Sequence, residues 1–256
     1  MVLGYVDFII EKYADPRTKR YFLMSSIWHP LILIATYLVF VNRIGPWFMK
    51  NRKPFNMKNI IMIFDVAQVI ANAYLVIQLV IRFPPINSNF CMEVDYKEDT
   101  HLKIAYIYFT LKVSDMLDTI FFVLKKNYAQ VSFLHVYHHS LMIIFSWIAV
   151  KFVGGGLTAI TGLANSFVHV VMYSYYFLSA YDVKYKNTFI KKFVTQVQII
   201  QFLLLFLIHF PYLFISCQYP KSITGFGVIQ AGYFFYLFSN FYYKTYIKPS
   251  KLGKVK

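Results

Sequence analysis

Long apolar runs constrain the fold of this 256-residue chain more than any other sequence feature, because each is about as long as a membrane-spanning helix. We identify seven of them, at residues 27–48, 59–81, 104–124, 131–150, 157–181, 193–217 and 226–247. The chain is 58% hydrophobic and 14% charged, whereas soluble domains are about 25% charged. We therefore predict an all-α, polytopic membrane protein with seven transmembrane helices, in a single integral-membrane domain over residues 1–256.

Basic residues give the chain a formal net charge of +15, which by itself would also suit a nucleic-acid-binding protein. However, the lysines and arginines lie in short clusters between the apolar runs, a pattern typical of polytopic membrane proteins. We therefore expect the lipid bilayer as a partner and no nucleic acid. The first 20 residues mix acidic and basic side chains without an apolar core, so we expect no cleavable signal peptide.

The distribution of positive charge predicts the orientation in the membrane. The connections after the first, third and fifth runs and the C-terminal tail together carry 16 lysines and arginines, and the opposite side carries 9. Because loops rich in positive charge stay in the cytosol, the C-terminus is predicted to be cytosolic and the N-terminus lumenal. Cys91 and Cys217 then share the lumenal side, where an oxidising environment favours a disulfide over the alternative of two unpaired thiols.

A histidine triplet lies inside the fourth apolar run. His135, His138 and His139 occupy positions i, i+3 and i+4, which share one face of a helix. Imidazole is well suited to proton or acyl transfer near neutral pH, and ionisable groups inside a membrane are costly. The triplet therefore indicates an active site, with histidines satisfied at a helix end as the structural alternative.

Charged residues also follow a helical spacing in the third run. Lys112, Asp115 and Asp118 step by three, and their burial in a membrane requires that they pair with each other or with neighbouring helices. Two interpretations stay open, a structural ion-pair network and a network that orients the histidines. In the second run, Asp65, Gln68 and Asn72 form a polar stripe that predicts packing against protein on that side.

The fifth and sixth runs each carry a further polar face. The fifth places five polar, sulfur-containing or aromatic residues along one side: Asn165, His169, Met172, Tyr173 and Tyr176. The sixth opens with polar residues at every third position: Thr195, Gln198 and Gln201. Such residues are often no more than contacts between helices. Counting inward at 1.5 Å per residue, however, places His138, His169 and Gln198 about 8 to 18 Å from the cytosolic helix ends. We therefore predict one polar layer, reached from the cytosol.

Four motifs in this order and spacing resemble the very-long-chain fatty acid elongase family, the condensing enzymes of the endoplasmic reticulum. An HxxHH box occupies residues 135–139, and a KxxExxDT-like motif occupies residues 112–119, with Asp115 at the family's glutamate. HxxMYxYY occupies residues 169–176 and TxxQxxQF residues 195–202. The resemblance covers essentially all seven runs.

The resemblance implies a 3-ketoacyl-CoA synthase that converts acyl-CoA and malonyl-CoA to 3-ketoacyl-CoA, CO2 and CoA, with no cofactor and no metal. It also implies that the acyl group is carried by His138, since both cysteines are predicted on the wrong side of the membrane. His169 and Asn165 are expected to stabilise the enolate formed from malonyl-CoA. The other polar groups are expected to set tautomers and charge around the site: His135, His139, Lys112 and Asp118.

Substrate binding, as implied by the resemblance, uses a narrow acyl tunnel enclosed by the second to seventh helices. CoA would sit at its cytosolic mouth against lysines. The expected substrate-binding residues are Lys125, Lys126, Tyr175, Tyr176, Lys191, Lys192, Gln198 and Lys244. Expected partners are the reductases and dehydratase of the elongation cycle, and a homo-oligomer is compatible with this interpretation. The expected location is the endoplasmic reticulum membrane.

Two other classes of protein remain as alternatives. A di-iron lipid desaturase or hydroxylase also uses HxxHH boxes, but needs about eight histidine or carboxylate ligands. This chain has seven histidines, and His29, His101 and His209 lie away from the cluster. A non-enzymatic seven-span transporter or receptor would not explain three histidines and a charged ladder at one depth.

Overall fold

The computed structural model describes residues 2–82, 92, 94, 96, 99–186, 188–217 and 219–248, and within these ranges it is helical without a strand. The prediction of an all-α fold is therefore confirmed. The chain forms two units. The first comprises Met1–Met57 and Ile77–Gly162, and the second comprises Lys58–Val76 and Leu163–Lys256.

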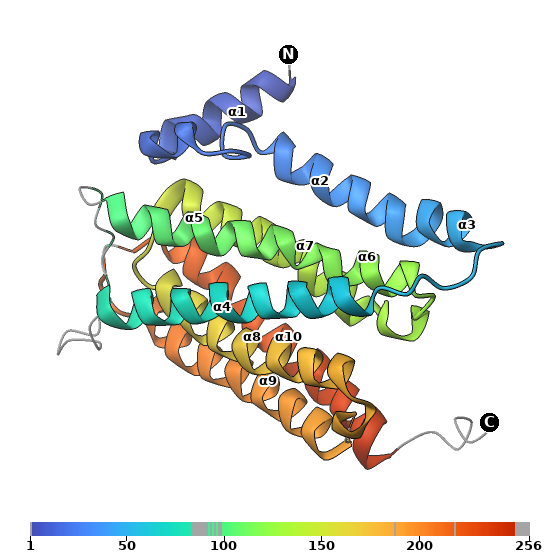
Figure 1. The fold of residues 1–256 in the computed structure, drawn as a ribbon. Helices are drawn as coiled ribbons and strands as arrows, with labels where there is room; N and C mark the ends of the chain where they lie inside the picture. The colour runs from blue at the N-terminus through green and yellow to red at the C-terminus, as the bar shows by residue number, and fades with distance from the viewer. Residues whose placement is uncertain are drawn as a thin grey trace. The chain divides into compact units, whose positions relative to one another are not determined.

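Each predicted apolar run is helical, although several helices begin or end elsewhere than predicted (Figure 1). The runs at 59–81 and 157–181 are the single helices α4 (Lys58–Arg82) and α8 (Thr158–Tyr181). The remaining runs are composite: α2 (Trp28–Val39), the π-helical turn η2 (Phe40–Ile44) and α3 (Gly45–Met49); α5 (Asp99–Ser114) and α6 (Met116–Leu124); α7 (Phe133–Ile148) and η4 (Ala149–Val153); α9 (Thr188–His209) and η6 (Phe210–Leu213); α10 (Lys221–Tyr242) and η7 (Tyr243–Ile247).

Four helical stretches in the described ranges are long and apolar enough to cross a membrane: Trp28–Met49, Lys58–Arg82, Phe133–Val153 and Phe189–Leu213. The third predicted run does not form one long helix, because the chain turns at Asp115 and leaves α5 and α6 with 16 and 9 residues. The protein is thus a membrane protein with several apolar helices, and the count of seven crossings stays a prediction.

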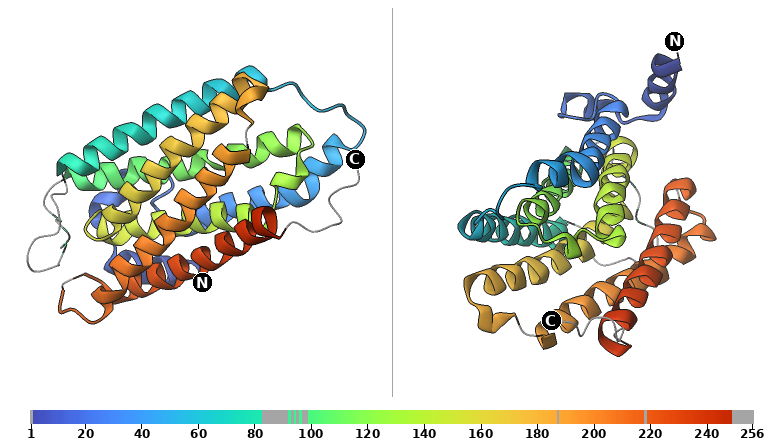
Figure 2. Two further views of the ribbon diagram at one scale, coloured as in Figure 1. Left: turned by 90° about the horizontal axis from the view of Figure 1, so that it is seen from below. Right: turned by 90° about the vertical axis from the view of Figure 1, so that its right-hand side faces the viewer.

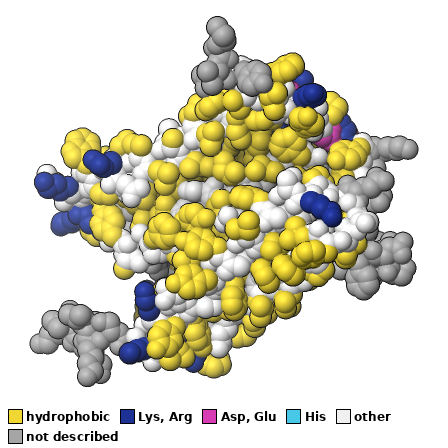
Figure 3. Space-filling view, turned by 180° about the vertical axis from the view of Figure 1, so that it is seen from behind, with side chains coloured by type: hydrophobic (Ala, Val, Ile, Leu, Met, Phe, Trp, Pro, Cys, Tyr) yellow, Lys and Arg dark blue, Asp and Glu magenta, His cyan; other side chains and the backbone are white. Residues whose placement is uncertain are grey.

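The surface pattern is also that of a membrane protein. Hydrophobic side chains cover much of the face in Figure 3, and lysines and arginines lie mainly toward its margins. Helix α4 exposes isoleucines such as Ile63 (71%) and Ile70 (64%) and buries its polar stripe of Asp65, Gln68 and Asn72. This arrangement, apolar outside and polar inside, confirms the prediction that one side of the helix packs against protein.

The first unit is built around α5 and α7, which lie side by side (Figure 1). Helix α2 packs on α7, and α3 packs on α6. The core includes Tyr37, Phe109, Ile143 and Trp147. Gly45 permits the close approach of α3 to α6, since a Cβ at this position would lie 2.6 Å from Val123 Cγ1. Helix α7 of this unit carries the HxxHH box.

The N-terminal segment is structured, although the sequence analysis assigned no helix to it. It forms α1 (Val2–Tyr13) and the 3₁₀ turn η1 (Pro16–Arg20). Lys151 of η4 is fully buried, forms an ion pair with Glu11 and donates to the carbonyl of Met24 over 2.9 Å. Arg20 pairs with Asp99 at 2.7 Å. Apolar patterning could not predict this segment, because ion pairs to distant residues hold it.

We predict that Glu11→Gln lowers the free energy of unfolding by about 2 kcal/mol, because it removes the carboxylate that pairs with the buried Lys151. Burial raises the pKa of Glu11, but hydrogen bonds from Lys151 and Lys19 outweigh it and hold the pKa below its ordinary value of 4.5. A carboxyl with a lowered pKa stabilises the fold above its unfolded pKa, and this contribution is lost as pH falls through the folded pKa. The difference between variant and wild type should therefore be full at neutral pH and vanish in acid.

Unfolding of the purified protein in detergent, followed at neutral pH and then at successively lower pH, measures this difference. Lys19→Gln is the matched control, because Lys19 pairs with the same carboxylate at 3.0 Å but its side chain is 64% exposed. A loss of stability on Lys19→Gln as large as that on Glu11→Gln would contradict the assignment to Lys151.

The second unit pairs α9 with α10, which lie next to each other as the orange and red helices of Figure 2. Phe202 of α9 packs between Phe234 and Phe238 of α10, with ring centroids 5.1 Å from each. Phe64 of α4 meets Tyr173 of α8 edge-on at 5.9 Å. Cys217, a residue of this unit, is disulfide-bonded. Cys91 lies outside the described residues, so the predicted pairing stays a prediction.

Candidate active site

The histidine box lies in the first two turns of α7. Ser132 caps this helix, and its hydroxyl accepts a hydrogen bond from the backbone N–H of His135 at 3.2 Å. The cap fixes the start of the helix and therefore the phase of the box. The ring centroids of His135 and His139 lie 4.3 Å apart, and those of His138 and His139 lie 5.5 Å apart. Three imidazoles thus form one continuous group.

The charged pair beside this box is buried. Lys112 Nζ lies 2.7 Å from Asp115 Oδ2, and the two side chains are 1% and 2% exposed. The prediction that Lys112 must be ion-paired is confirmed, and the short side chain of Asp115 reaches it. Lys112 also lies over the ring of Tyr108, 5.1 Å from its centroid. Asp118 is buried in the first turn of α6, beyond the turn at Asp115.

A chain of hydroxyls that the sequence analysis missed leads to the box. Thr119 Oγ1 of α6 lies 2.8 Å from His135 Nε2, and Tyr37 Oη of α2 lies 2.7 Å from Thr119 Oγ1. Thr119 had a place in the KxxExxDT-like motif but no assigned role. No sequence signal pointed to Tyr37, because a single tyrosine in an apolar run is typical of membrane helices.

The polar face of α8 lies in the second unit. Asn165 and His169 are 3% and 4% exposed, and the rings of His169 and Tyr173 meet at 5.5 Å. Gln198 of α9 donates to Met172 Sδ over 3.6 Å, within the range for sulfur acceptors. Tyr175 and Tyr176 continue α8, with ring centroids 6.1 Å apart. Since the box lies in the first unit, its convergence with His169, Asn165 and Gln198 stays a prediction.

The lysines predicted to bind CoA lie at helix ends. Lys125 and Lys126 follow α6, and Lys126 donates from Nζ to the carbonyl of Lys50 over 3.3 Å. In the second unit, Lys191 and Lys192 lie in the first two turns of α9, and Lys244 lies in η7. Lys192 Nζ is 5.7 Å from the ring centroid of Tyr242. Each group is partly or fully exposed, as a binding site for an anion requires.

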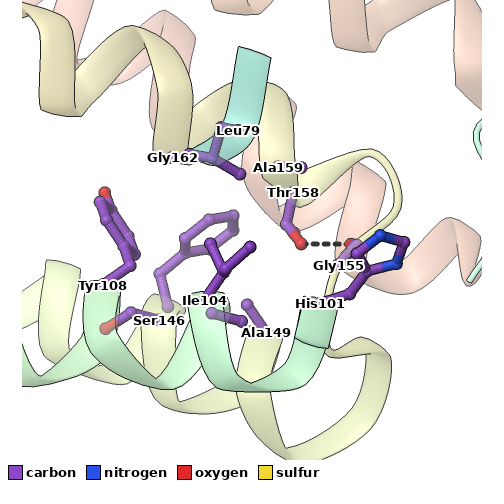
Figure 4. A pocket seen from close by; sticks show the side chains of 12 residues that line it. Leu79, His101, Ile104, Tyr108, Ser146, Ala149, Gly155, Thr158, Ala159 and Gly162 are labelled. Atoms are coloured by element: carbon purple, nitrogen blue, oxygen red, sulfur yellow. Dashed lines mark hydrogen bonds between the residues drawn. The ribbon is translucent and has the colours of Figure 1, made fainter. Parts of the chain in front are cut away.

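A small apolar pocket lies within the first unit, between α5, α7 and the start of α8 (Figure 4). His101 lies near one end and Tyr108 near the other. Thr158 Oγ1 donates to the carbonyl of Gly155 over 2.6 Å, which leaves that hydroxyl satisfied within the wall. Several lining residues are small: Ala105, Ser146, Ala149, Gly155, Ala159 and Gly162. The pocket therefore offers space for an apolar group.

Among the described residues, no three histidine, cysteine or carboxylate side chains are grouped to hold a metal ion.

Comparison with known proteins gives one consistent result. Residues 22–254 match the family model described as ELO, the GNS1/SUR4 family. The chain is 37% identical over 256 residues to a very long chain fatty acid elongase of Aedes aegypti, covering 96% of this chain and 72% of that relative. It is 37% identical to very long chain fatty acid elongase 7 of Drosophila melanogaster, covering 96% of this chain and 76% of that relative. It is 38% identical over 244 residues to very long chain fatty acid elongase 4 of Homo sapiens, covering 93% of this chain and 77% of that relative.

The helical fold and the half-buried histidine box define a class first, that of membrane proteins with a polar site among their apolar helices. The comparisons then identify the chain within that class. It belongs to the ELO family, as the motifs predicted.

Proposed function

We propose that this chain is a fatty acid elongase that condenses acyl-CoA with malonyl-CoA to give 3-ketoacyl-CoA, CO2 and CoA. Membership of the ELO family and the names of its relatives support fatty acid elongation. The observation that carries the chemistry is the contiguous group of His135, His138 and His139 at the start of α7. A group of adjacent imidazoles provides a nucleophile and a proton acceptor.

The proposed reaction has two steps. A ring nitrogen of His138 attacks the thioester carbonyl of acyl-CoA, the C–S bond breaks, and the CoA thiolate takes up the proton that the imidazole loses. Malonyl-CoA then loses CO2, and the carbon of the resulting enolate attacks the acyl carbonyl. The C–N bond to His138 breaks, and the ring nitrogen takes up one proton from the medium, which gives neutral imidazole and 3-ketoacyl-CoA. His169 and Asn165 stabilise the enolate oxygen, while Lys112, Asp118, His135 and His139 set the charge around the site.

The proposed setting is the endoplasmic reticulum membrane, with seven crossings, a lumenal N-terminus and a cytosolic C-terminus. CoA binds from the cytosol against the helix-end lysines Lys125, Lys126, Lys191, Lys192 and Lys244. The acyl chain lies in a narrow tunnel enclosed by the second to seventh spans, near Tyr175, Tyr176 and Gln198. The product is a 3-ketoacyl-CoA, so a reductase and a dehydratase must act next to complete an elongation cycle.

A direct assay tests this proposal. Purified protein, given labelled malonyl-CoA and acyl-CoAs of graded length, should release labelled CO2 and form labelled 3-ketoacyl-CoA when both substrates are present. Neither substrate alone should give the ketone. Failure of well-folded protein to form 3-ketoacyl-CoA from any acyl-CoA would contradict the proposed reaction.

We further predict that the pocket of the first unit holds the methyl end of the acyl chain. In Gly162→Leu the new side chain fills the space between Leu79 and Tyr108. The longest acyl-CoA that wild type elongates should then lose about 10- to 100-fold in kcat/KM, while shorter acyl-CoAs keep their rates. The measurement is kcat/KM across the graded acyl-CoAs.

Gly162→Ala is the matched control for this substitution. A Cβ at Gly162 would lie 3.5 Å from Leu79 Cδ1 and 4.0 Å from Tyr108 Cδ2, which are ordinary contacts. The alanine variant should therefore keep the wild-type length profile. Equal losses at every length in Gly162→Leu would indicate misfolding or remote disruption, and would contradict the placement of the methyl end.

A further inference from the structure

We propose that Tyr37 is a positioning residue that acts through Thr119 to fix the tautomer and orientation of His135. This role goes beyond the proposed reaction, and rests on it only for the effect on rate. The three residues come from three helices, α2, α6 and α7, that belong to the same unit. Tyr37 and His135 are almost 100 positions apart in the sequence, so only folding brings them together.

The geometry is that of a continuous hydrogen-bonded chain. The distance from Tyr37 Oη to Thr119 Oγ1 is 2.7 Å, and that from Thr119 Oγ1 to His135 Nε2 is 2.8 Å. Both distances lie in the range of good hydrogen bonds from a hydroxyl group. Tyr37 is 5% exposed and Thr119 is fully buried, so bulk water does not compete for these groups.

Counting protons shows which group donates in each of these two hydrogen bonds. Among the described residues, the hydrogen-bond partner of the Tyr37 hydroxyl is Thr119, so the buried Tyr37 O–H donates to Thr119 Oγ1. The Thr119 hydroxyl carries a single proton, so it donates its one hydrogen bond to His135 Nε2. Nε2 is therefore the acceptor nitrogen of His135, and the ring proton lies on Nδ1. The reverse direction would leave a buried tyrosine O–H without an acceptor, at the cost of its desolvation.

This arrangement gives the histidines of the box different roles. The lone pair of His135 Nε2 is engaged by Thr119, so His135 is a poor nucleophile and serves to orient its neighbour. Its ring lies 4.3 Å from that of His139, and His139 in turn meets His138 edge-on at 5.5 Å. A His135 ring held by Thr119 and Tyr37 therefore limits the positions that His139 and His138 can take. Helix α2 thus takes part in the site although it contributes no histidine to it.

Nitrogen-15 NMR of histidine-labelled protein in lipid or detergent tests the tautomer directly, with the His135 signal assigned by its loss in His135→Gln. Wild type should show His135 protonated on Nδ1. Thr119→Val, which has nearly the same shape but no hydroxyl, should abolish this preference, and Thr119→Ser should restore it. Protonation of His135 on Nε2 in the wild type would overturn the proposal, whether or not the protein condenses acyl-CoA with malonyl-CoA.

Kinetics provide the second readout. Tyr37→Phe should lower kcat by about 10-fold or more, with little change in KM for acyl-CoA, because the substrate does not contact Tyr37. Tyr106→Phe is the control, since it also removes one tyrosine hydroxyl from the first unit, where Tyr106 donates to the carbonyl of Phe22 over 3.4 Å. If Tyr37→Phe is too unstable to assay, the pair Thr119→Val and Thr119→Ser decides the same question.

Three outcomes are informative. A loss of kcat in both Tyr37→Phe and Thr119→Val, no larger in the double variant than in either single one, supports a single chain of hydrogen bonds. Unchanged kcat and an unchanged His135 tautomer in Thr119→Val would overturn the proposal. Absence of condensation by the wild type would contradict the proposed function instead, and the NMR result would still decide the role of Tyr37.

Discussion

His138→Ala is expected to lose both the acyl-enzyme and the condensation product, with a fall in kcat of about 1000-fold or more. The expectation follows from the proposed two-step reaction, in which the ring of His138 carries the acyl group between two encounters with CoA substrates. Wild-type protein mixed with acyl-CoA alone should release free CoA in a burst that equals the amount of enzyme. Its intact mass should increase by that of one acyl group.

Two further variants test whether the acyl group is carried by His138 in particular or whether loss of any histidine prevents the reaction. His29→Ala serves as the control, because His29 lies at the start of α2, where Ser25 Oγ approaches its Nδ1 at 3.3 Å. It should retain the burst and the adduct. His169→Ala is expected to form the acyl adduct yet fail to condense, because its assigned role begins with malonyl-CoA. If His138→Ala still acquires the acyl mass and turns over, the covalent assignment is wrong.

The apolar runs predicted the helices well, because hydropathy directly reports which residues can face lipid. They predicted helix ends less well. Helix α9 begins at Thr188 and not at 193, since Lys191 and Lys192 extend the helix beyond its apolar section. Helix α10 likewise begins at Lys221, directly after Pro220. A helix continues as long as its backbone groups are hydrogen-bonded, whereas an apolar run ends at the first lysines.

The turn between α5 and α6 was missed for a different reason. Lys112, Asp115 and Asp118 fit a continuous helix by spacing, and nothing in that spacing marks Asp115 as the point where the helix is interrupted. The spacing did predict that Lys112 would need a partner. Burial of the pair at 1% and 2% exposure agrees with that electrostatic argument.

Contacts between distant parts of the chain set the limit of prediction from sequence. The histidine box was visible because its members share one helix within five residues. Tyr37 and Thr119 are 82 positions apart, and Glu11 and Lys151 are 140 apart. Neither pair forms a local pattern, and each becomes meaningful only when the fold shows which helices are neighbours. A motif therefore reveals the groups on one helix, and the fold reveals the groups that orient them.

The buried ion pair of Lys112 and Asp115 is expected to dominate the stability of the first unit. Asp115→Asn replaces the carboxylate 2.7 Å from Lys112 Nζ by a neutral amide and leaves an ammonium group that is 1% exposed. Loss of one member of a buried pair costs about 3–5 kcal/mol, because the remaining charge keeps its desolvation penalty and loses its nearest counter-charge. Unfolding of the purified variant in detergent measures this loss. Asp115→Glu, which introduces the family's residue, should retain most of the stability.

A control variant and a double variant test whether the loss of stability comes from leaving one buried charge without its partner. Asp182→Asn removes the partner of Lys184 at 3.4 Å, where the side chains are 64% and 41% exposed, and should cost at most about 0.5 kcal/mol. Lys112→Met combined with Asp115→Asn removes both charges, so it should recover much of the stability lost in Asp115→Asn alone. It should not recover condensation if the pair also sets the charge around the histidines. Recovery of both would assign the pair a structural role only, whereas recovery of stability without activity would assign it to the site as well.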